Sequence, residues 1–376
     1  MLTPRKAAII AAFLLTAFYL LHNTHTPVST LSTHPTSPLP TKLSEAKDAS
    51  IPKTTGGSDK TSKSSEQDIS RPYPPPRPPV QNQRKVQQPL TGPSSKPLRE
   101  QLSYQFPYDL EGKFPAYIWQ TWKATPSSGE FSDTFRAAEA SWTEKHPGFV
   151  HEVVTDEAAV YLMRHLYASV PQVVDAYKAL PVPVMKADFF RYLILLARGG
   201  IYSDIDTSAI QSATDWLPKE VSRSTIGLVI GIEADPDRED WHDWFSRRIQ
   251  FCQWTIQAKP GHPVLREIVA SLTEEILDAK AKGTLKQKCK GANVIEFTGP
   301  ARWTDTVFSY MNDPRYFKVQ GGKNITWEAF TGMTSAKKVG DVVVLPITSF
   351  SPGVQQMGAK EPDDPMAFVK HDFEGT

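Results

Sequence analysis

The segment Lys186–Thr207 constrains the fold more than any other part of this chain. Apolar residues recur in its first half at spacings of three and four, which predicts a helix with one buried face. The pair Gly199-Gly200 allows the positive φ that ends a helix, and residues 201–203 then predict a short buried strand. The strand ends at Asp204 and Asp206, where α/β proteins usually bind their ligands.

The two carboxylates suit a divalent cation. In an extended backbone Asp204 and Asp206 point the same way, whereas Ile205 turns into the core. Paired anionic oxygens favour Mg²⁺ or Mn²⁺, ions that usually also bind substrate phosphates. About one Asp-x-Asp is expected by chance in a chain of this length, and the second one, Asp235-Pro236-Asp237, fits a solvated turn better. The helix, turn and strand around the first pair favour it as a site.

The rest of the chain alternates between strand and helix patterns. Strands are predicted at 116–120, 149–154, 226–232 and 342–346, and helices at 131–146, 156–166 and 262–281. This alternation predicts an α/β domain whose sheet is flanked by helices. No G-x-G-x-x-G follows any of these strands, which removes most support for a dinucleotide-dependent oxidoreductase. The net charge of +1 gives no electrostatic reason to expect nucleic acid as a partner.

The first 105 residues differ in composition from the rest. Residues 7–21 form an apolar run, and residues 7–22 are predicted to be a transmembrane signal-anchor in the lipid bilayer, since no convincing signal-peptide cleavage site follows them. The positive charge before this run puts the tail, residues 1–6, in the cytoplasm. Residues 23–105 are rich in Pro, Ser and Thr, so we expect a disordered lumenal stem. The folded domain is then predicted to span 106–376.

The motif D-x-x-R-Y, followed by a short apolar run and G-G-I-Y-x-D-x-D, resembles glycosyltransferase family 32 and related glucosylating toxins. Other segments resemble the fungal outer-chain-initiating α-1,6-mannosyltransferases of that family: Ile118–Lys123, Gly231–Asp235, Thr298–Pro300, Leu345–Ile347, Phe350–Gly353 and Met357–Lys360. The resemblance spans roughly Phe114 to the C-terminus. It implies a GT-A-like fold, with a Rossmann-like mixed sheet, and retaining α-1,6 transfer of mannose from GDP-mannose to an N-linked glycan. It also implies a single-pass type II protein of the Golgi membrane with a lumenal catalytic domain.

The resemblance also implies roles for individual residues. Asp204 and Asp206 would be catalytic, because the Mn²⁺ or Mg²⁺ that they hold neutralises the diphosphate leaving group. His371, which precedes F-E-G, would be the third metal ligand. The implied donor-binding residues are Trp119, Asp188, Arg191, Tyr202, Thr298 and Gly299. Judged from the residues alone, Trp119 is equally compatible with a core tryptophan and His371 with an ordinary surface histidine.

Four further features bear on a lumenal enzyme. Asn324 begins the one N-glycosylation sequon. Cys252 and Cys289 are too few for a structural zinc site, and an oxidising lumen would permit a disulfide between them, although nothing in the sequence brings them together. The acids of Glu233–Asp235 are either ligands for sugar hydroxyls or part of a solvated turn. Trp241–Phe245 is either a surface for sugar stacking or one core-facing side of a helix.

Three alternative functions stay open at this point. Asp204–Ser208 resembles the D-x-D-x-T nucleophile loop of Mg²⁺-dependent phosphohydrolases, although the strand before it is short and Asp363-Asp364 fits poorly as the second acidic pair. A non-catalytic glycan-binding protein would tolerate substitution of Asp206. A family 32 transferase acting on inositol phosphoceramide would normally carry further membrane-inserting segments, and no apolar run after Leu21 approaches the length of a membrane span.

Overall fold

A mixed seven-stranded sheet forms the centre of the molecule, in the order β2-β1-β3-β6-β5-β8-β7. The computed structural model describes residues 96–291, 293–317 and 323–374, so the predicted tail, the signal-anchor 7–22 and the stem up to residue 95 lie outside the described residues. Its strands are β1 (Tyr117–Thr121), β2 (Val150–Val154), β3 (Gly200–Ser203), β5 (Leu228–Ala234), β6 (Gln250–Ala258), β7 (Lys337–Val339) and β8 (Val342–Leu345). A separate two-stranded sheet pairs β4 (Thr207–Ala209) with β9 (Val369–His371).

Strand direction fixes where a ligand can bind. β1 is parallel to β2 and β3, β5 is parallel to β8, and the antiparallel strand β6 lies between β3 and β5. The C-terminal ends of β1, β2, β3, β5 and β8 therefore lie along one side of the sheet, across the strand direction. This side is called an edge below and is not an outermost strand. Asp204 follows β3 at this edge, which is where sheets of this kind usually bind ligands. We call it the catalytic edge.

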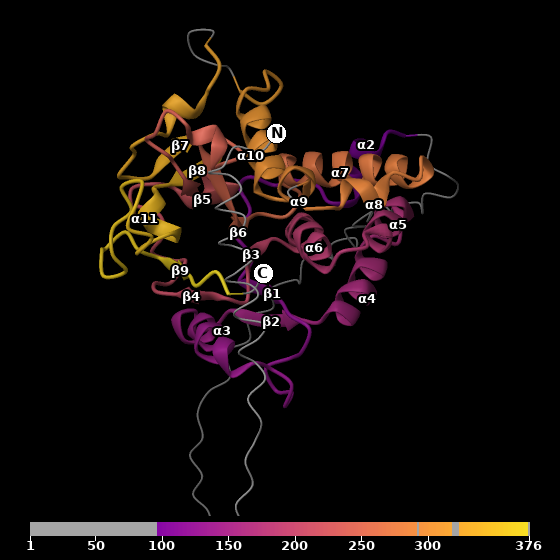
Figure 1. The fold of residues 1–376 in the computed structure, drawn as a ribbon, viewed down its shortest axis with the longest axis horizontal. Coiled ribbons are helices and arrows are strands. Elements are labelled where there is room, and N and C mark those ends of the chain that lie inside the picture. The colour runs from indigo at the N-terminus through magenta and orange to yellow at the C-terminus, as the bar shows by residue number, and fades with distance from the viewer. Residues whose placement is uncertain (1–95, 292, 318–322, 375–376) are drawn as a thin grey trace, which may run out of the picture. The chain divides into compact units, whose positions relative to one another are not determined.

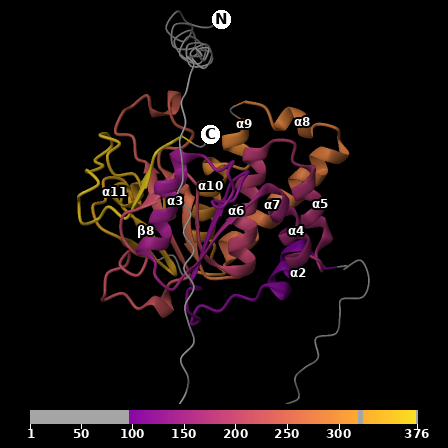
Figure 2. The same ribbon diagram turned by 90° about the horizontal axis from the view of Figure 1, so that it is seen from below.

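Helices cover both faces of the sheet (Figures 1 and 2). One face carries α4 (Asp156–Leu166), α5 (Pro171–Ala179), α6 (Pro183–Arg198), α7 (Pro263–Ala281) and α10 (Pro300–Met311). The other face carries α3 (Asp133–Lys145), α11 (Ile347–Phe350) and the β4–β9 sheet. The short helices α8 (Leu285–Lys288) and α9 (Asn293–Phe297) lie between α7 and α10 in sequence. Side chains of β3 alternate between the two faces of the sheet, so Ile201 packs on one face and Tyr202 on the other.

The central helix α6 confirms the prediction made from its sequence. Pro183 occupies its first turn, where a missing N–H costs nothing, and the helix ends at Gly199 with φ of 64°. A Cβ on Gly199 would lie 2.8 Å from the Ala258 carbonyl oxygen, and one on Gly200 would lie 2.6 Å from that of Tyr117. The glycine pair is therefore required for the close approach of three backbone segments as well as for the helix end.

The predicted start of the folded domain is wrong by several residues. Leu98–Gln105, which we assigned to the stem, form helix α2. Its Leu98 and Leu102 are buried, and Arg99 forms ion pairs with Glu267 and Glu274 on α7. The helical spacing of two leucines is a weak pattern next to a Pro- and Ser-rich segment, so composition alone placed the boundary too late.

A second buried carboxylate lies at the opposite edge of the sheet, just before β8. Asp341 accepts hydrogen bonds from the hydroxyl groups of Tyr108 and Tyr310, and its Oδ2 lies 3.3 Å from Nε2 of His262. His262 also caps α7, because its Nδ1 accepts a hydrogen bond from the Val264 N–H. We call Asp341 and these three partners the Asp341 cluster. The cluster connects the loop between α2 and β1, helix α7 and helix α10 to the start of β8.

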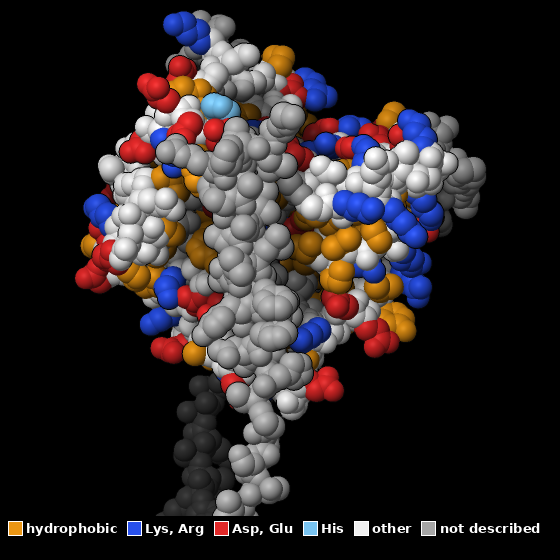
Figure 3. Space-filling view, in the orientation of Figure 1, with side chains coloured by type: hydrophobic (Ala, Val, Ile, Leu, Met, Phe, Trp, Pro, Cys, Tyr) orange, Lys and Arg blue, Asp and Glu red, His pale blue; other side chains and the backbone are white. Residues whose placement is uncertain are grey.

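The two cysteines are free thiols in the structure, and both are buried. Cys252 on β6 belongs to the core on one face of the sheet, whereas Cys289 belongs to the core on the other face. The possible disulfide is therefore not formed. Around the core, acidic and basic side chains are interspersed on the visible surface (Figure 3). Among the described residues no helix has both the length and the apolar character of a membrane span.

Candidate active site

The backbone after β3 forms a turn that presents the two aspartates. The Asp204 N–H donates to the Trp254 carbonyl on β6, and the Asp204 carbonyl accepts from the Thr207 N–H at 3.2 Å. The segment is therefore a tight turn between β3 and β4, and the predicted extended backbone is wrong. Gln120 stabilises the turn because its Nε2 donates to the Asp204 carbonyl at 3.0 Å. Ile205 turns into an apolar cluster with Phe131, as expected.

The Asp204 carboxylate is held by side chains from α6 and β3. The Tyr202 hydroxyl donates to its Oδ1 at 2.8 Å, and Nη2 of Arg191 lies 3.0 Å from the same oxygen. Nη1 of Arg191 lies 3.1 Å from Oδ1 of Asp188, one helical turn away on α6. Arg191 is only 3% exposed, so one buried guanidinium joins two carboxylates at the catalytic edge.

Asp188 connects this group to the start of α10. Its Oδ2 accepts a hydrogen bond from the Thr298 hydroxyl at 2.7 Å, and its Oδ1 accepts one from Nε2 of Gln253 at 3.0 Å. The Tyr192 hydroxyl lies between Gln253 and the Thr298 carbonyl and bonds both. Gly299 follows as the N-cap of α10, where a Cβ would lie 2.7 Å from the Ile295 Cα.

The C-terminal segment carries His371 to Asp206. β9 pairs with β4 so that His371 lies opposite Thr207. His371 Nε2 lies 3.2 Å from Asp206 Oδ2, and the same oxygen accepts a hydrogen bond from the Glu374 N–H at 3.0 Å. The His371 ring packs between Trp254 and Phe373, with centroid distances of 4.5 and 4.0 Å. Residues far apart in sequence thus meet, and the role of His371 as a metal ligand stays a prediction.

The site buries several carboxylates around Arg191, and burial disfavours their charged forms. Burial raises the pKa of Asp204, Arg191 opposes that shift, and the nearby carboxylate of Asp206 adds to it. Burial also raises the pKa of Asp188 and of Glu233, which lies near the end of β5. A buried carboxylate keeps its charge at low cost only when a cation lies close. Arg191 forms ion pairs with Asp188 and Asp204, and its charge also opposes the effect of burial on the pKa of Glu233. A further cation beside these acids would stabilise their ionised forms.

The residues match a divalent cation in donor type. Asp204 and Asp206 offer hard oxygen atoms and His371 offers a nitrogen, a combination that suits Mn²⁺ better than Mg²⁺. His371 Nδ1 is buried and has no hydrogen-bond partner among the described residues. Within this part of the chain, however, no three acidic, histidine or cysteine side chains already form a cluster suited to a metal. A bound ion would compete with the contacts that Arg191 and Tyr202 make to Asp204.

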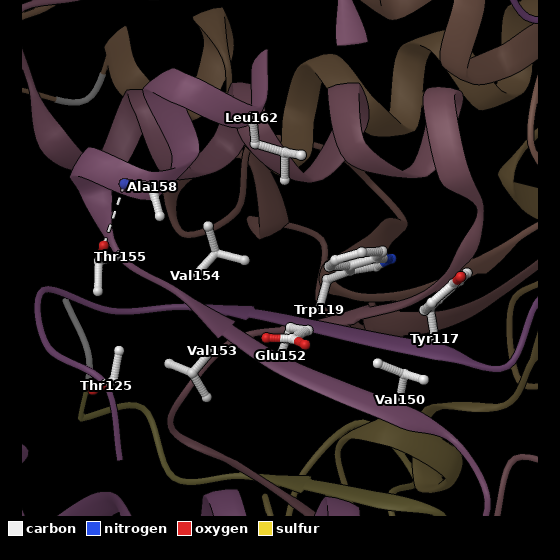
Figure 4. Close-up of a pocket in the computed structure, with 10 residues that line it drawn as sticks. All are labelled: Tyr117, Trp119, Thr125, Val150, Glu152, Val153, Val154, Thr155, Ala158 and Leu162. Atoms are coloured by element: carbon white, nitrogen blue, oxygen red, sulfur yellow. Dashed lines mark hydrogen bonds between the residues drawn. The ribbon is translucent and has the colours of Figure 1, made fainter. Parts of the chain in front are cut away.

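An open groove of about 480 Å³ lies between the strands β1 and β2 and helix α4 (Figure 4). Trp119 and Tyr117 of β1 line it with stacked rings whose centroids lie 5.2 Å apart, and Glu152 of β2 faces it. Trp119 is 8% exposed, and its indole N–H donates to the Gly199 carbonyl. The Thr121 hydroxyl, 3.1 Å from that of Tyr202, links the groove's strand to Asp204.

Several polar residues of this site had no role assigned from the sequence. Gln120 and Gln253 bond the Asp204 carbonyl and the Asp188 carboxylate, and Glu233 is held by Nε2 of Gln250 at 3.0 Å. Trp122 follows β1 and packs against Phe135, and its buried indole N–H has no partner among the described residues. Glutamines within otherwise apolar strands could have indicated these roles, because a buried side-chain amide requires hydrogen-bond partners.

The comparisons with known proteins agree with this geometry. Residues 132–223 match the family described as "Glycosyltransferase sugar-binding region containing DXD motif". The initiation-specific alpha-1,6-mannosyltransferase of Candida albicans is 48% identical over 76% of this chain and 77% of its own length. The Saccharomyces cerevisiae protein of the same name is 34% identical over 74% and 81%. Inositol phosphoceramide mannosyltransferase 3 of Schizosaccharomyces pombe is 34% identical, but over only 31% and 34%.

The mixed α/β fold, the aspartate pair at a strand end and the matched sugar-binding region define a glycosyltransferase with a DXD motif. The two long matches are specific enough to go further. The chain belongs to glycosyltransferase family 32, in the family of the initiation-specific α-1,6-mannosyltransferases. The phosphohydrolase interpretation of Asp204–Ser208 is therefore dropped.

Proposed function

We propose that this protein transfers mannose from GDP-mannose to an N-linked glycan in α-1,6 linkage, on a GT-A-like fold. The observation that carries the proposal is the buried network in which Arg191 joins Asp188 to Asp204. It connects the aspartate motif to polar groups that can bind a sugar, in a chain whose long matches are named α-1,6-mannosyltransferases. The family membership supports a catalytic role over that of a glycan-binding protein.

Each side chain of the network has a role that its chemistry supports. Asp188 accepts hydrogen bonds and lies beside the Thr298 hydroxyl, so these two residues bind hydroxyl groups of the donor mannose, and Gly299 follows them at the start of α10. Arg191 binds the diphosphate through its planar guanidinium, and Tyr202 orients Asp204. When held by Asp204, Asp206 and His371, Mn²⁺ or Mg²⁺ supplies charge that stabilises the leaving diphosphate.

The groove beside β1 is the proposed site of the nucleoside end of the donor. Thr121 at the end of β1 contacts Tyr202, which in turn bonds Asp204, so a donor whose diphosphate lies at the aspartates would extend its base along β1. Trp119 contributes part of one ring to this groove. Stereochemical retention, which the family resemblance implies, would be read from the anomeric proton of the product by NMR.

An N-glycan acceptor is favoured over inositol phosphoceramide by the extent of the matches. The two α-1,6-mannosyltransferases match about three quarters of this chain, whereas the inositol phosphoceramide enzyme matches less than a third. We further propose that the protein is a type II Golgi membrane protein anchored by residues 7–22. Asn324 is exposed and accessible to the lumenal glycosylation that this topology predicts.

The test is a donor and acceptor survey with the purified full-length chain and Mn²⁺. We expect GDP-mannose to be consumed only when a high-mannose N-glycan is present, and linkage analysis of the product to give α-1,6-mannose. Inositol phosphoceramide in mixed micelles is the competing acceptor, and UDP-sugars are the competing donors. Turnover with inositol phosphoceramide alone would overturn the acceptor, and turnover of a UDP-sugar alone would overturn the donor.

A further inference from the structure

The loop that joins β5 to β6 extends from the catalytic edge. β5 runs parallel to β3 through their shared antiparallel neighbour β6, so the loop of residues 235–249 leaves the sheet on the side of Asp204. Two side-chain contacts close its base. Gln250 Nε2 donates to Glu233 Oε2 at 3.0 Å, and Arg248 Nη1 donates to Asp235 Oδ1 at 3.1 Å. We call residues 235–249 the β5–β6 loop.

The root of this loop is fixed to a neighbouring segment. Asp235 is buried and accepts hydrogen bonds from the Thr331 hydroxyl at 2.8 Å and from the Gly332 N–H at 2.6 Å. The Arg248 guanidinium lies over the Trp327 ring, 4.4 Å from its centroid. Asp235 is therefore a structural anchor, and the loop emerges from a defined position beside the donor site.

Near the end of the loop an indole is held outward. Trp244 is 54% exposed. The Arg238 guanidinium lies 4.7 Å from its ring centroid, and the indole N–H donates to Oδ2 of Asp240 at 3.3 Å. Arg238 and Asp240 are also joined to each other, with Nη2 and Oδ2 2.8 Å apart. The indole is thus oriented by a charged pair that covers one face and leaves much of the ring in water.

The core alternative for this segment is wrong. Trp241–Asp243 form one turn of 3₁₀ helix, and none of its residues is buried. A large exposed aromatic that is fixed by charged neighbours is typical of a binding surface, because its rigid ring buries area at little entropic cost. Fixing a charged pair and an indole in water has no evident structural purpose at this position.

We propose that the β5–β6 loop binds the oligomannose part of the acceptor, with Trp244 as the stacking surface. This inference rests on the proposed function. The C–H face of a mannose ring packs on the open face of the indole, and its hydroxyl groups bond the exposed edges of Arg238 and Asp240. A glycan whose reacting end lies at the donor site extends outward along this loop. Trp244 therefore contributes to recognition of long acceptors over single sugars.

The test compares two exposed aromatics that have the same type of neighbour. Trp244→Ala removes the proposed surface, Trp244→Phe keeps an aromatic ring, and Tyr161→Ala is the control. Tyr161 on α4 is 59% exposed and also lies beside an arginine, Arg164. Ligand-observed NMR measures the Kd of a free high-mannose N-glycan and of methyl α-mannoside for each full-length variant, without donor.

Loss of the stacking surface should raise the Kd of the long glycan by about 3- to 10-fold. We expect Trp244→Phe to restore most of the affinity, and methyl α-mannoside binding to change less than glycan binding. An unchanged glycan Kd in Trp244→Ala would overturn the proposal and favour a protein contact at this loop. An equal loss for both ligands would also overturn it. Wild-type glycan binding without turnover of GDP-mannose would refute the proposed function and leave this inference standing.

Discussion

Two buried carboxylate clusters lie at opposite edges of the same sheet and differ in their charge balance. At the Asp341 cluster, one carboxylate is surrounded by two hydroxyl donors and an imidazole. At the catalytic edge, the charge of Arg191 acts on Asp188, Asp204 and Glu233, and Asp206 lies close enough to raise the pKa of Asp204 further. The first arrangement places two hydroxyl donors and an imidazole around one acid, and the second places several acids around one guanidinium.

The pKa shifts of the two clusters run in opposite directions. Burial alone would raise the pKa of Asp341, but His262, Tyr108 and Tyr310 outweigh it and lower the pKa to about 2. At the other edge, burial and the neighbouring acid together keep the pKa of Asp204 raised although Arg191 opposes them. Donors stabilise the ionised Asp341 and hence the fold, whereas the acids near Arg191 cost stability until a cation or ligand binds. The comparison separates a structural acid from a functional one.

The largest expected effect is on catalysis. Asp206→Asn removes charge from the cation site but keeps the shape of the side chain and its contact with the Glu374 N–H. We expect the rate of GDP-mannose turnover with saturating Mn²⁺ to fall by about 100-fold or more. The thermal midpoint should stay within about 3 °C of the wild type, since part of the repulsion with Asp204 is relieved. A large fall in the midpoint would assign Asp206 to the fold instead.

The corresponding substitution in the Asp341 cluster should lower stability and leave catalysis unchanged. Asp341→Asn replaces an acceptor of two hydroxyl hydrogen bonds with an amide that meets the same donors. Hydrogen bonds to a charged group contribute about 1.5 to 3 kcal/mol each, so we expect an overall loss of about 2 to 3 kcal/mol in the free energy of unfolding. Denaturant titration measures this loss. The kcat of the folded fraction should equal that of the wild type, and a tenfold lower kcat would contradict the assignment.

The contribution of Asp341 to stability should also be measurable in the wild type at low pH. The folded-state pKa of Asp341, about 2, lies below the ordinary value of 3.8. The stabilisation is therefore fully present above about pH 4 and is lost as the pH falls toward 2, an expected contribution of about 2 kcal/mol. Denaturant titrations at pH 5, 4, 3 and 2 measure the slope, and Asp341→Asn should show a shallower one. Equal slopes in the two proteins would mean that other carboxylates account for the acid sensitivity.

The sequence predicted local elements better than it predicted contacts. Helix α6 and its end at Gly199 followed from residue spacing and from glycine's freedom at positive φ. The boundary at 105 was missed because two leucines in α2 find their partners on α7, far along the chain. The turn after β3 was missed because Gln120 and Thr207 bind the Asp204 carbonyl, and backbone periodicity carries no information on such contacts.

The candidate site was predictable where a motif carried it. Asp188, Arg191, Tyr202 and Thr298, which the family resemblance gives as donor-binding residues, lie in one connected group with Asp204. Their binding of the donor stays a prediction. The resemblance gave no indication that Gln253 would orient Asp188, since an amide on a strand is common to many folds. Such partners become neighbours only when α6, β6 and α10 pack together. No local pattern in the sequence indicates that packing.

The smallest expected effect concerns two tryptophans in or next to β1. One has a bonded indole N–H, and the other has no such bond within the described part of the chain. Trp119 donates its indole N–H to the Gly199 carbonyl, whereas the buried N–H of Trp122 has no partner among the described residues. A satisfied group is expected to stabilise the fold, whereas an unmet donor beside the site is available to a ligand, and we predict that the donor nucleotide accepts from it. Trp122→Phe should therefore weaken GDP binding by about 3- to 10-fold, the cost of one lost hydrogen bond. Trp119→Phe keeps an aromatic ring on the groove but loses the hydrogen bond to Gly199, so it should mainly lower the thermal midpoint. Calorimetric titration of GDP into both full-length variants with Mn²⁺ measures the binding, and a larger loss of affinity in Trp119→Phe would reverse the two assignments.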